Sequence, residues 1–381
     1  MNFSKSDYKI CIVGLGYVGL PLSAIFASKG FDIIGFDINN IRVKELSSNI
    51  DRNDDIDLDK LKILNQNSKL TSNLNDIQDC NVFIVTVPTP INSDKTPNLE
   101  PIIASSKLVG GLMKKGSLVI YESTVYPGVT DEICTPILEK ESSFTLNKDF
   151  STAYSPERIV PGDKVNTIEK IKKIVSASNT KALEIVSFFY SSIIDAGIHQ
   201  APSIKVAEAA KVTENIQRDV NIALINEMHQ LYSSIGISTS DVLEAAATKW
   251  NFMHLTPGLV GGHCISIDPY YLMHKSKMSG YTPNIMLAAR KLNDEMSEWV
   301  VDNFFEFIKK QNIDIKKTII TIMGYTFKEN CSDIRNTKVH DLVISLKNHG
   351  LQINIWDPFL TKETQEELSK NNIISYTNEP R

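Results

Sequence analysis

The fold is decided by residues 8–28, which read YKICIVGLGYVGLPLSAIFAS. Residues 8–13 form an apolar, β-rich run, residues 14–19 match the pattern G-x-G-x-x-G, and residues 21–28 are typical of a helix. In that pattern the first glycine permits a tight turn, the second lets the backbone approach a pyrophosphate, and the third lets the helix pack on the strand. The stretch therefore predicts a strand, a phosphate-binding loop and a helix whose positive end faces the phosphates.

The next predicted strand, residues 31–37, ends at Asp37, 18 residues after the last glycine of the loop. A carboxylate at this place holds the ribose 2′-hydroxyl of a dinucleotide and repels a 2′-phosphate, so NAD is favoured over NADP. Arg42 follows closely and is assigned to the same site. The alternative is a glycine turn with a purely structural role. The cofactor-binding residues predicted in this region are Gly14, Gly16, Tyr17, Val18, Gly19, Asp37 and Arg42.

Strands and helical patterns continue to alternate through the first two hundred residues. Residues 82–87 and 118–121 predict two more strands, and each is followed by a polar or proline-marked loop. This rhythm predicts βαβ units and a parallel sheet, with ligands bound at the carboxyl ends of the strands. Residues 49–59 are polar and are expected to form a solvated loop. The loop residues expected to reach the cofactor are Pro88, Thr89, Ser123 and Thr124.

The pattern changes at Ser203. Residues 203–235 contain neither proline nor glycine, Ser203 suits an N-cap, and Gly236 suits the position after the helix. Such a helix would be about 50 Å long, which favours a spine between domains or subunits and hence a homodimer or a higher oligomer. Residues 283–310 predict a second long helix.

The last part of the chain begins a new α/β unit. Residues 318–323 predict a strand, residues 339–348 a helix and residues 352–356 another strand, with room for one more helix and strand. The predicted fold class is therefore α/β, with two Rossmann-like parallel-sheet domains joined by a helical middle domain that contains the long central helix. The expected domains are residues 1–200, 201–312 and 313–381.

The composition excludes several partners. The net charge of −5 and the lack of a basic stripe argue against nucleic acid and against an anionic membrane. No run reaches the roughly 18 apolar residues that a spanning helix needs. The five cysteines are widely spread, which favours free thiols in a reducing compartment and hence the cytoplasm. The histidines, cysteine and aspartate of residues 254–274 match no common zinc pattern, so no metal is expected.

The strongest catalytic candidate is Cys264, in the run LVGGHCISID at residues 259–268. The two glycines bring the backbone close to whatever binds there, and a thiol can hold an aldehyde covalently for a second oxidation. A buried apolar cysteine is the alternative. Lys211 and Asn215 lie four residues apart on the predicted long helix and share a face, where they could stabilise a developing alkoxide. A solvated helix face is the alternative for that pair.

Two loop residues complete the candidates. Thr124 ends a strand on the expected ligand edge, and Glu157 lies in the loop of residues 155–158. Ordinary turn or cap roles are the alternative for each.

Together these motifs resemble the UDP-glucose/GDP-mannose dehydrogenase family over nearly the whole chain. In the family's order, the glycine loop is followed by matching stretches at residues 123–128, 155–157, 207–215, 261–268 and 324–335. The sequences ATKWNF at 247–252 and PGLVGGHC at 257–264 are similar to the branch that oxidises UDP-N-acetylhexosamines. UDP-glucose oxidisers usually carry Pro-Lys-Asp after the cysteine, where this chain has Ser-Ile-Asp at 266–268.

The resemblance implies an NAD-dependent enzyme that oxidises C6 of UDP-GlcNAc or UDP-GalNAc to the uronic acid, for surface polysaccharide precursors such as capsule. It implies a thiohemiacetal and a thioester on Cys264, and it does not separate the two epimers. The implied catalytic residues are Cys264, Lys211, Asn215, Asp268, Thr124 and Glu157. The implied substrate-binding residues are Glu157, Arg158, Lys211, Asn215, Lys249, Gly261 and Lys328, and Arg335 is implied near the NAD pyrophosphate.

Two departures from the family and two rival functions remain open. Pro161 stands where UDP-glucose members have a second glutamate, and the chain stops at Arg381, some tens of residues early, so a shortened UDP-binding domain is expected. One rival is a two-electron hydroxyacid dehydrogenase, which also combines a Rossmann domain with a Lys/Asn helix but needs no thiol. The other is a truncated, non-catalytic nucleotide-binding protein.

Overall fold

The structure is a computed structural model that describes residues 3–53, 55–159, 167–262, 265–315, 318–329 and 331–376. The chain divides into two compact units, Met1–Thr213 and Glu214–Arg381, and the division falls within helix α7 (Ile204–Ser234). The division into three domains expected from the sequence stays a prediction.

The first unit is built on an eight-stranded sheet with the order β3-β2-β1-β4-β5-β6-β7-β8. Its neighbouring strands are parallel except for β6 and β7, which run antiparallel. The first six strands have the order of a dinucleotide-binding fold, which confirms the predicted fold class. The strands are β1 (Lys9–Val13), β2 (Asp32–Phe36), β3 (Lys69–Thr71), β4 (Val82–Val85), β5 (Leu118–Tyr121), β6 (Ser151–Tyr154), β7 (Lys173–Ala177) and β8 (Ile198–Gln200).

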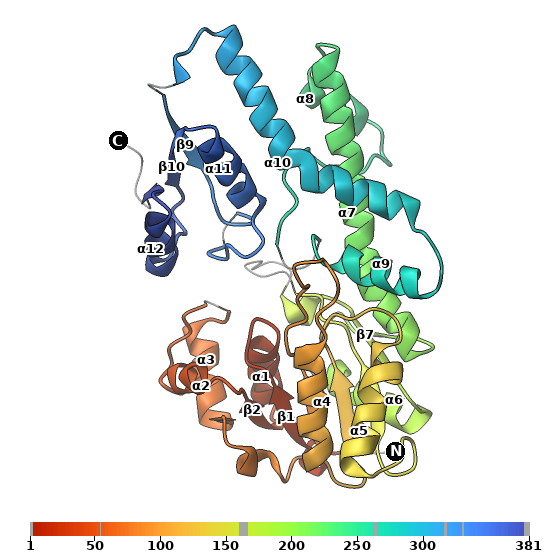
Figure 1. The fold of residues 1–381 in the computed structure, drawn as a ribbon. Helices are drawn as coiled ribbons and strands as arrows, with labels where there is room; N and C mark the ends of the chain where they lie inside the picture. The colour runs from red at the N-terminus through yellow and green to blue at the C-terminus, as the bar shows by residue number, and fades with distance from the viewer. Residues whose placement is uncertain are drawn as a thin grey trace. The chain divides into compact units, whose positions relative to one another are not determined.

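Helices cover both faces of this sheet because its strands are apolar on both sides (Figure 1). Ile10 and Ile12 of β1 share a core with α1, α3 and α6. On the other face, Ser106 of α4 hydrogen-bonds to the hydroxyl of Tyr121 in β5, and α4 packs against α5. The helices are α1 (Gly19–Ser28), α2 (Asn40–Ser47), α3 (Leu58–Asn67), α4 (Glu100–Leu112), α5 (Thr135–Ser142) and α6 (Thr180–Ser191).

The strand order gathers three loops at one edge of the sheet. Val13 at the end of β1 is in register with Phe36 of β2 on one side and with Val85 of β4 on the other. The residues that follow these strand ends therefore lie at the point where the strand order reverses, which is where ligands bind in open α/β sheets.

The second unit begins with two long helices. The sequence predicts helices over residues 203–235 and 283–310, and the structure confirms both as α7, with 31 residues, and α10 (Asn284–Lys310), with 27. Helices α8 (Thr239–Ala247) and α9 (Asp268–Met278) lie between them, and α10 contacts both α9 and α11 (Lys338–Asn348).

A small parallel sheet with the order β11-β10-β9 completes the second unit. Ile353 and Ile355 of β10 are buried in a core with α11 and α12, whereas Ile319 and Met323 of β9 point to the exposed face. The predicted last helix and strand are present. These elements are β9 (Ile319–Met323), β10 (Gln352–Trp356), α12 (Lys362–Lys370) and β11 (Ile374–Tyr376). Within the described ranges, no helix is long and apolar enough to cross a membrane.

Candidate active site

The glycine loop after β1 has the shape that a pyrophosphate requires. Gly14 has a φ of +102°, which side-chain-bearing residues rarely adopt. A Cβ on Gly19 would lie 1.8 Å from the Gly14 carbonyl oxygen, so only glycine lets α1 start here. A Cβ on Gly16 would meet no described atom within 4 Å, so the backbone there is open to a ligand. The loop therefore fits the dinucleotide predicted from the sequence.

Asp37, at the end of β2, is fixed by two backbone groups. Its Oδ2 accepts a hydrogen bond from the Leu15 amide, and its Oδ1 accepts one from the Asn39 amide, both at 2.8 Å. An ionised carboxylate can accept about four hydrogen bonds, so these two leave capacity for ribose hydroxyls. The Asn39 side chain in turn caps α2.

Arg42 is buried and held by two acids. Its Nη1 lies 2.7 Å from Asp51 Oδ1 and its Nη2 lies 2.9 Å from Asp55 Oδ2. Its Nε donates to the Leu15 carbonyl oxygen at 3.2 Å. The expectation that residues 49–59 form a solvated loop is therefore wrong for both aspartates, whose side chains are only 6% and 11% exposed. The polar composition concealed this, because a buried guanidinium draws carboxylates in with it.

Hydrogen bonds join the loops that follow β1, β4 and β5. Thr86 Oγ1 donates to the Gly14 carbonyl oxygen at 2.8 Å, and Ser123 Oγ donates to the Val87 carbonyl oxygen at 2.7 Å. Pro88 is exposed and Thr89 is partly buried in the same region. The sequence analysis missed Thr86, although its place directly after a buried strand was a usable signal.

Glu122 carries a buried charge directly before Ser123. Its Oε2 lies 2.6 Å from Nζ of Lys173 on β7, and its Oε1 accepts a hydrogen bond from the hydroxyl of Tyr190 on α6. Burial, followed by the charge of Glu122, raises the pKa of Tyr190 well above its ordinary value. The antiparallel strand β7 thereby anchors the end of β5, from which Ser123 and Thr124 extend.

Glu157 and Lys211 come together in the first unit. Lys211 Nζ lies 3.9 Å from Glu157 Oε2, and their side chains are 6% and 3% exposed. A solvated helix face is therefore excluded for Lys211. Thr124 is partly buried, and Arg158 directs its Nη1 to the backbone carbonyl oxygen of Lys172 at 2.6 Å.

Glu208, one turn before Lys211 on α7, was missed by the sequence analysis. Its carboxylate is fully buried and accepts hydrogen bonds from the amides of Gly128 at 2.6 Å and Thr130 at 2.9 Å. It thus caps the helical turn Thr130–Cys134 and ties α7 to the loop that begins at Thr124. Burial raises its pKa to about 7, although the two backbone hydrogen bonds oppose the shift.

In the second unit the structure brings Asn215 and Asp268 together. Asn215 Nδ2 donates to Asp268 Oδ2 at 2.6 Å, and both residues are buried. Asp268 is the first residue of α9, where a carboxylate is favoured by the positive end of the helix dipole. The bond fixes the Asn215 amide and leaves its second N–H for another acceptor.

The two glycines before Cys264 pack against another part of the second unit. A Cβ on Gly261 would lie 2.6 Å from the carbonyl oxygen of Asn336, and one on Gly262 would lie 2.7 Å from the Phe327 ring. The close approach that the glycines permit is therefore made, at least in part, by the chain's own Phe327 and Asn336. Cys264 itself lies outside the described residues.

The other predicted residues of this unit lie nearer the surface. Lys328 is partly buried, beside those glycine contacts in sequence, and Arg335 forms an ion pair with Asp333 at 2.6 Å. Lys249 is exposed after α8. Their contacts with ligands stay predictions.

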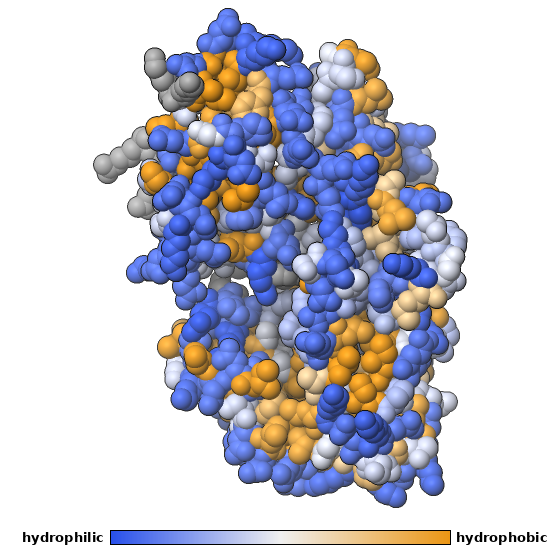
Figure 2. All heavy atoms as spheres, viewed as in Figure 1, coloured by the Kyte–Doolittle hydropathy of each residue, from blue (hydrophilic) through white to orange (hydrophobic). Residues whose placement is uncertain are grey.

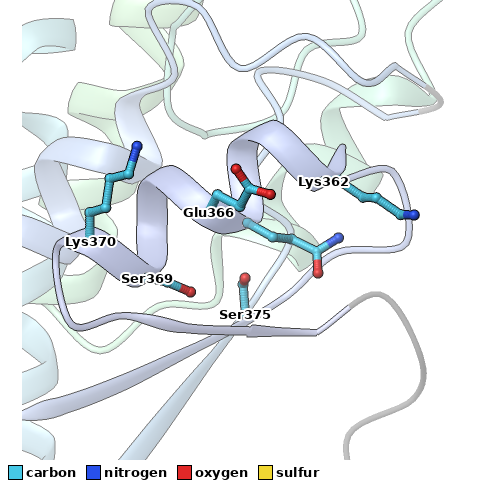
Figure 3. A pocket seen from close by; sticks show the side chains of 6 residues that line it. Lys362, Glu366, Ser369, Lys370 and Ser375 are labelled. Carbon is cyan, nitrogen blue, oxygen red and sulfur yellow. The ribbon is translucent and has the colours of Figure 1, made fainter.

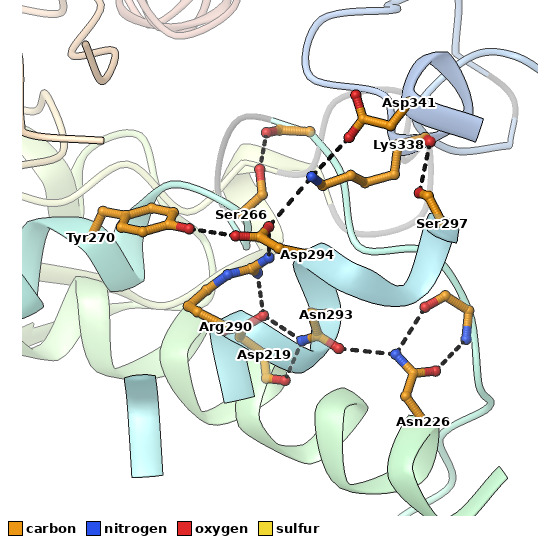
Figure 4. A network of polar contacts seen from close by, with 12 residues as sticks. Asp219, Asn226, Ser266, Tyr270, Arg290, Asn293, Asp294, Ser297, Lys338 and Asp341 are labelled. Atoms are coloured by element: carbon orange, nitrogen blue, oxygen red, sulfur yellow. Dashed lines mark hydrogen bonds and ion pairs between the residues drawn. The ribbon is translucent and has the colours of Figure 1, made fainter. Parts of the chain in front are cut away.

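A polar network holds the helices around Asp268 together (Figure 4). Asp219 of α7 accepts hydrogen bonds from Arg290 Nη1 at 2.5 Å and from Asn293 Nδ2 at 2.8 Å. Arg290 also donates a hydrogen bond to Asp294, and Asp294 accepts a second one from the hydroxyl of Tyr270 on α9 at 2.6 Å. Burial raises the pKa of Asp219, and the positive charge of Arg290 opposes the shift. The network rigidifies the helices that carry Asn215 and Asp268.

An open depression of about 620 Å³ lies on the second unit, between α12 and β11 (Figure 3). The side chains around it are polar or charged and include Lys362, Glu366 and Ser375. None of the predicted site residues lines it, so it has no part in the candidate site.

Three successive stretches of the chain match one protein family. Residues 8–194 match the NAD binding domain of the UDP-glucose/GDP-mannose dehydrogenase family. Residues 205–295 match its central domain, and residues 321–380 match its UDP binding domain. The NAD-binding match covers strands β1 to β7, the glycine loop, Asp37 and Glu157, and the central match covers Lys211, Asn215 and Asp268.

The chain is also similar to individual proteins over most of its length. The chain is 52% identical to a UDP-N-acetyl-D-glucosamine 6-dehydrogenase of Pseudomonas aeruginosa, over 94% of this chain and 84% of the relative. It is 49% identical to Protein CapL of Staphylococcus aureus, over 91% of this chain and 81% of that protein. A solved structure of a UDP-D-ManNAc dehydrogenase from Pyrococcus horikoshii is similar with a TM-score of 0.87 and 32% identity, covering 93% of this chain and 84% of the other.

Proposed function

Because this chain belongs to the UDP-glucose/GDP-mannose dehydrogenase family, and is thus an NAD-dependent UDP-sugar dehydrogenase, we propose that it oxidises C6 of a UDP-N-acetylhexosamine to the carboxylate. The proposed substrate is UDP-GlcNAc or UDP-GalNAc. It is supported by the identity of about half of all aligned residues to a UDP-N-acetyl-D-glucosamine 6-dehydrogenase. The reaction removes four electrons and consumes one water.

The proposed chemistry centres on the thiol of Cys264. NAD, when bound, accepts the hydride that leaves C6 in each of the two oxidations. After the first, the Cys264 sulfur adds to the aldehyde carbon and gives a thiohemiacetal. The second oxidation converts this adduct to a thioester, and water then breaks the C–S bond to release the acid and the thiol. A thiolate suits both steps, because it is a strong nucleophile near neutral pH and a good leaving group.

The roles of the other residues follow from their charges and partners. We assign Lys211 and Asn215 to the oxyanion of the adduct, Lys211 through its charge and Asn215 through its remaining amide N–H. Asp268 and Thr124 are assigned to the hydrolytic water, and Glu157 to the lining of the site beside Lys211. Substrate contacts are assigned to Arg158, Lys249, Gly261 and Lys328.

The observation that carries the proposal is the burial of Lys211 and Asn215 on one helix. Lysine is rarely buried, and the buried Lys211 Nζ lies beside another predicted site residue, 3.9 Å from Glu157 Oε2. A buried cation and a fixed amide are the groups that stabilise a developing oxyanion.

Replacing the nucleophile tests the proposal. We expect Cys264→Ser to abolish formation of the uronic acid while the affinity for NAD is unchanged, since serine is not ionised near neutral pH. The matched control is Cys331→Ser, which changes another free cysteine and should leave turnover intact. Full four-electron turnover by Cys264→Ser would exclude the mechanism. Little loss in that variant is what the rival two-electron hydroxyacid dehydrogenase predicts.

A panel of UDP-sugars tests the substrate. Preference for UDP-GlcNAc or UDP-GalNAc over UDP-glucose supports the proposal, and the better of the two names the epimer. Folded protein that oxidises none of the sugars would favour the rival reading, a non-catalytic nucleotide-binding protein.

We further propose that the enzyme acts in the cytoplasm as a homodimer and supplies a precursor of surface polysaccharide. The similarity to Protein CapL supports the pathway, and the free cysteines among the described residues support a reducing compartment. Leu231 near the end of α7, and Ile235 and Ile237 just after it, are exposed apolar side chains. Figure 2 shows apolar side chains gathered in this region, at its upper right. Such a patch favours contact with a second protein surface.

A further inference from the structure

We propose that Asp51 and Asp55 set the preference for NAD over NADP by occupying Arg42, the cation that would otherwise pair with a 2′-phosphate. The proposal concerns the dinucleotide site alone and does not depend on which sugar is oxidised. It extends the role of Asp37, which the sequence already suggests.

Arg42 is placed to meet the adenosine end of the dinucleotide. It lies five residues after Asp37, in the first turn of α2, and its Nε donates to the carbonyl oxygen of Leu15 inside the glycine loop. An arginine in this part of a Rossmann fold is the residue that accommodates the 2′-phosphate of NADP. Position alone would therefore allow the chain to use either dinucleotide.

Asp51 and Asp55 prevent Arg42 from binding a 2′-phosphate, because they occupy the hydrogen-bond donors of its guanidinium. Asp51 takes Nη1 at 2.7 Å and Asp55 takes Nη2 at 2.9 Å, so each arm of the planar fork already has a carboxylate. Asp51 is itself fixed, because its Oδ2 accepts hydrogen bonds from the amides of Asp55 at 2.7 Å and Ile56 at 3.0 Å. The position of the Asp51 carboxylate is thus set by the backbone of Asp55 and Ile56.

The charge balance works in the same direction. Asp51 and Asp55 place two carboxylates on one guanidinium, whose side chain is 8% exposed. Asp37 adds a third negative charge close by, because it accepts a hydrogen bond from the amide of Leu15, the residue whose carbonyl oxygen Arg42 bonds. A 2′-phosphate would bring up to about two more negative charges into this group. In a partly buried setting such repulsion is weakly screened by salt.

The alternative is a purely structural role, in which the ion pairs only hold Asp51 and Asp55 against α2. In that case removing the aspartates would weaken the fold and lower the affinity for both dinucleotides together. The two readings therefore differ in the ratio of the two affinities.

The test is direct titration of NAD and NADP into the free protein by calorimetry, without sugar. For Asp51→Asn/Asp55→Asn we expect the ratio of the NADP Kd to the NAD Kd to fall at least tenfold relative to the unchanged protein. The control is Asp59→Asn, which removes one negative charge from a side chain that is 91% exposed and 3.5 Å from Lys62. Its ratio should stay within twofold.

A third variant isolates Arg42. In Arg42→Met/Asp51→Asn/Asp55→Asn the ratio should return to within threefold of the starting value, because the released cation is gone. An unchanged ratio in the double variant overturns the proposal, and so does a gain for NADP that persists in the triple variant. If the double variant does not fold, the single variant Asp55→Asn replaces it, because it keeps the backbone contacts of Asp51. The ratio of the NADP Kd to the NAD Kd in that variant must then fall at least threefold for the proposal to stand.

Discussion

The buried charged residues around the candidate site are its least expected feature. Glu122, Lys173 and Glu208 are not among the site residues predicted from the sequence, yet they fix the loops from which Ser123 and Thr124 extend. From the sequence alone a charged residue is expected at the surface, because the partner that would allow its burial is distant along the chain. The Lys173 partner of Glu122 is 51 residues away, and the loop capped by Glu208 is about 80 residues away.

Glu208 makes stability depend on pH. Its pKa rises from 4.5 in the unfolded chain to about 7 in the fold, so the folded state binds the proton more tightly. The stabilisation is complete below pH 4.5 and is lost as the pH rises through 7, by up to about 3 kcal/mol. In urea unfolding from pH 4.5 to 8, we expect the free energy of unfolding to fall with pH more steeply than in Glu208→Gln. The exposed Glu184→Gln should follow the unchanged protein, and parallel curves for Glu208→Gln would refute this assignment.

Lys173→Met should be strongly destabilising, because it leaves the buried carboxylate of Glu122 without its cation. We expect a loss of roughly 3–5 kcal/mol in the free energy of unfolding. Lys115→Met breaks an ion pair whose lysine is 72% exposed, and should cost less than about 1 kcal/mol. Glu122→Gln/Lys173→Met removes both charges and should recover much of the stability. Equal costs for the two lysine variants would show that the buried pair has no special role.

At the scale of elements, the sequence predicts most of what the structure contains. The strand β5 matches its predicted range of residues 118–121, and α7 and α10 end within one residue of theirs. Hydrophobic periodicity and the glycine or proline residues at the ends of elements are local signals, so they predict the bounds of such elements well. The antiparallel pairing of β6 with β7 and the burial of the Asp51 and Asp55 side chains depend on tertiary contacts, and no local signal marks them.

The junction of β1 and α1 should tolerate no side chain at residue 19. In Gly19→Ala the new Cβ would lie 1.8 Å from a backbone oxygen, so the loop must distort, and we expect the affinity for NAD to drop at least tenfold. Gly111→Ala in α4 is the matched control, since a Cβ there meets no described atom within 4 Å. That variant should bind NAD normally and gain up to about 1 kcal/mol in stability. Normal NAD affinity in Gly19→Ala would contradict the geometry of the loop.

At the scale of the whole molecule, the predicted catalytic residues are divided between the two units. Glu157 and Lys211 meet in the first, Asn215 and Asp268 meet in the second, and α7 carries one residue of each pair. The motifs and their resemblance to the dehydrogenase family identify these residues without coordinates. The supporting contacts of Glu122 and Glu208 could not be found in the same way, because they are defined by packing and not by spacing.

The central claim is that one active site removes four electrons from the same carbon. It is tested most directly by counting NADH, from its absorbance, against the UDP-N-acetylhexosamine consumed by the unchanged protein. The account predicts two NADH and one uronic acid for each sugar, with no free aldehyde. One NADH per sugar, with the aldehyde as the final product, would contradict it.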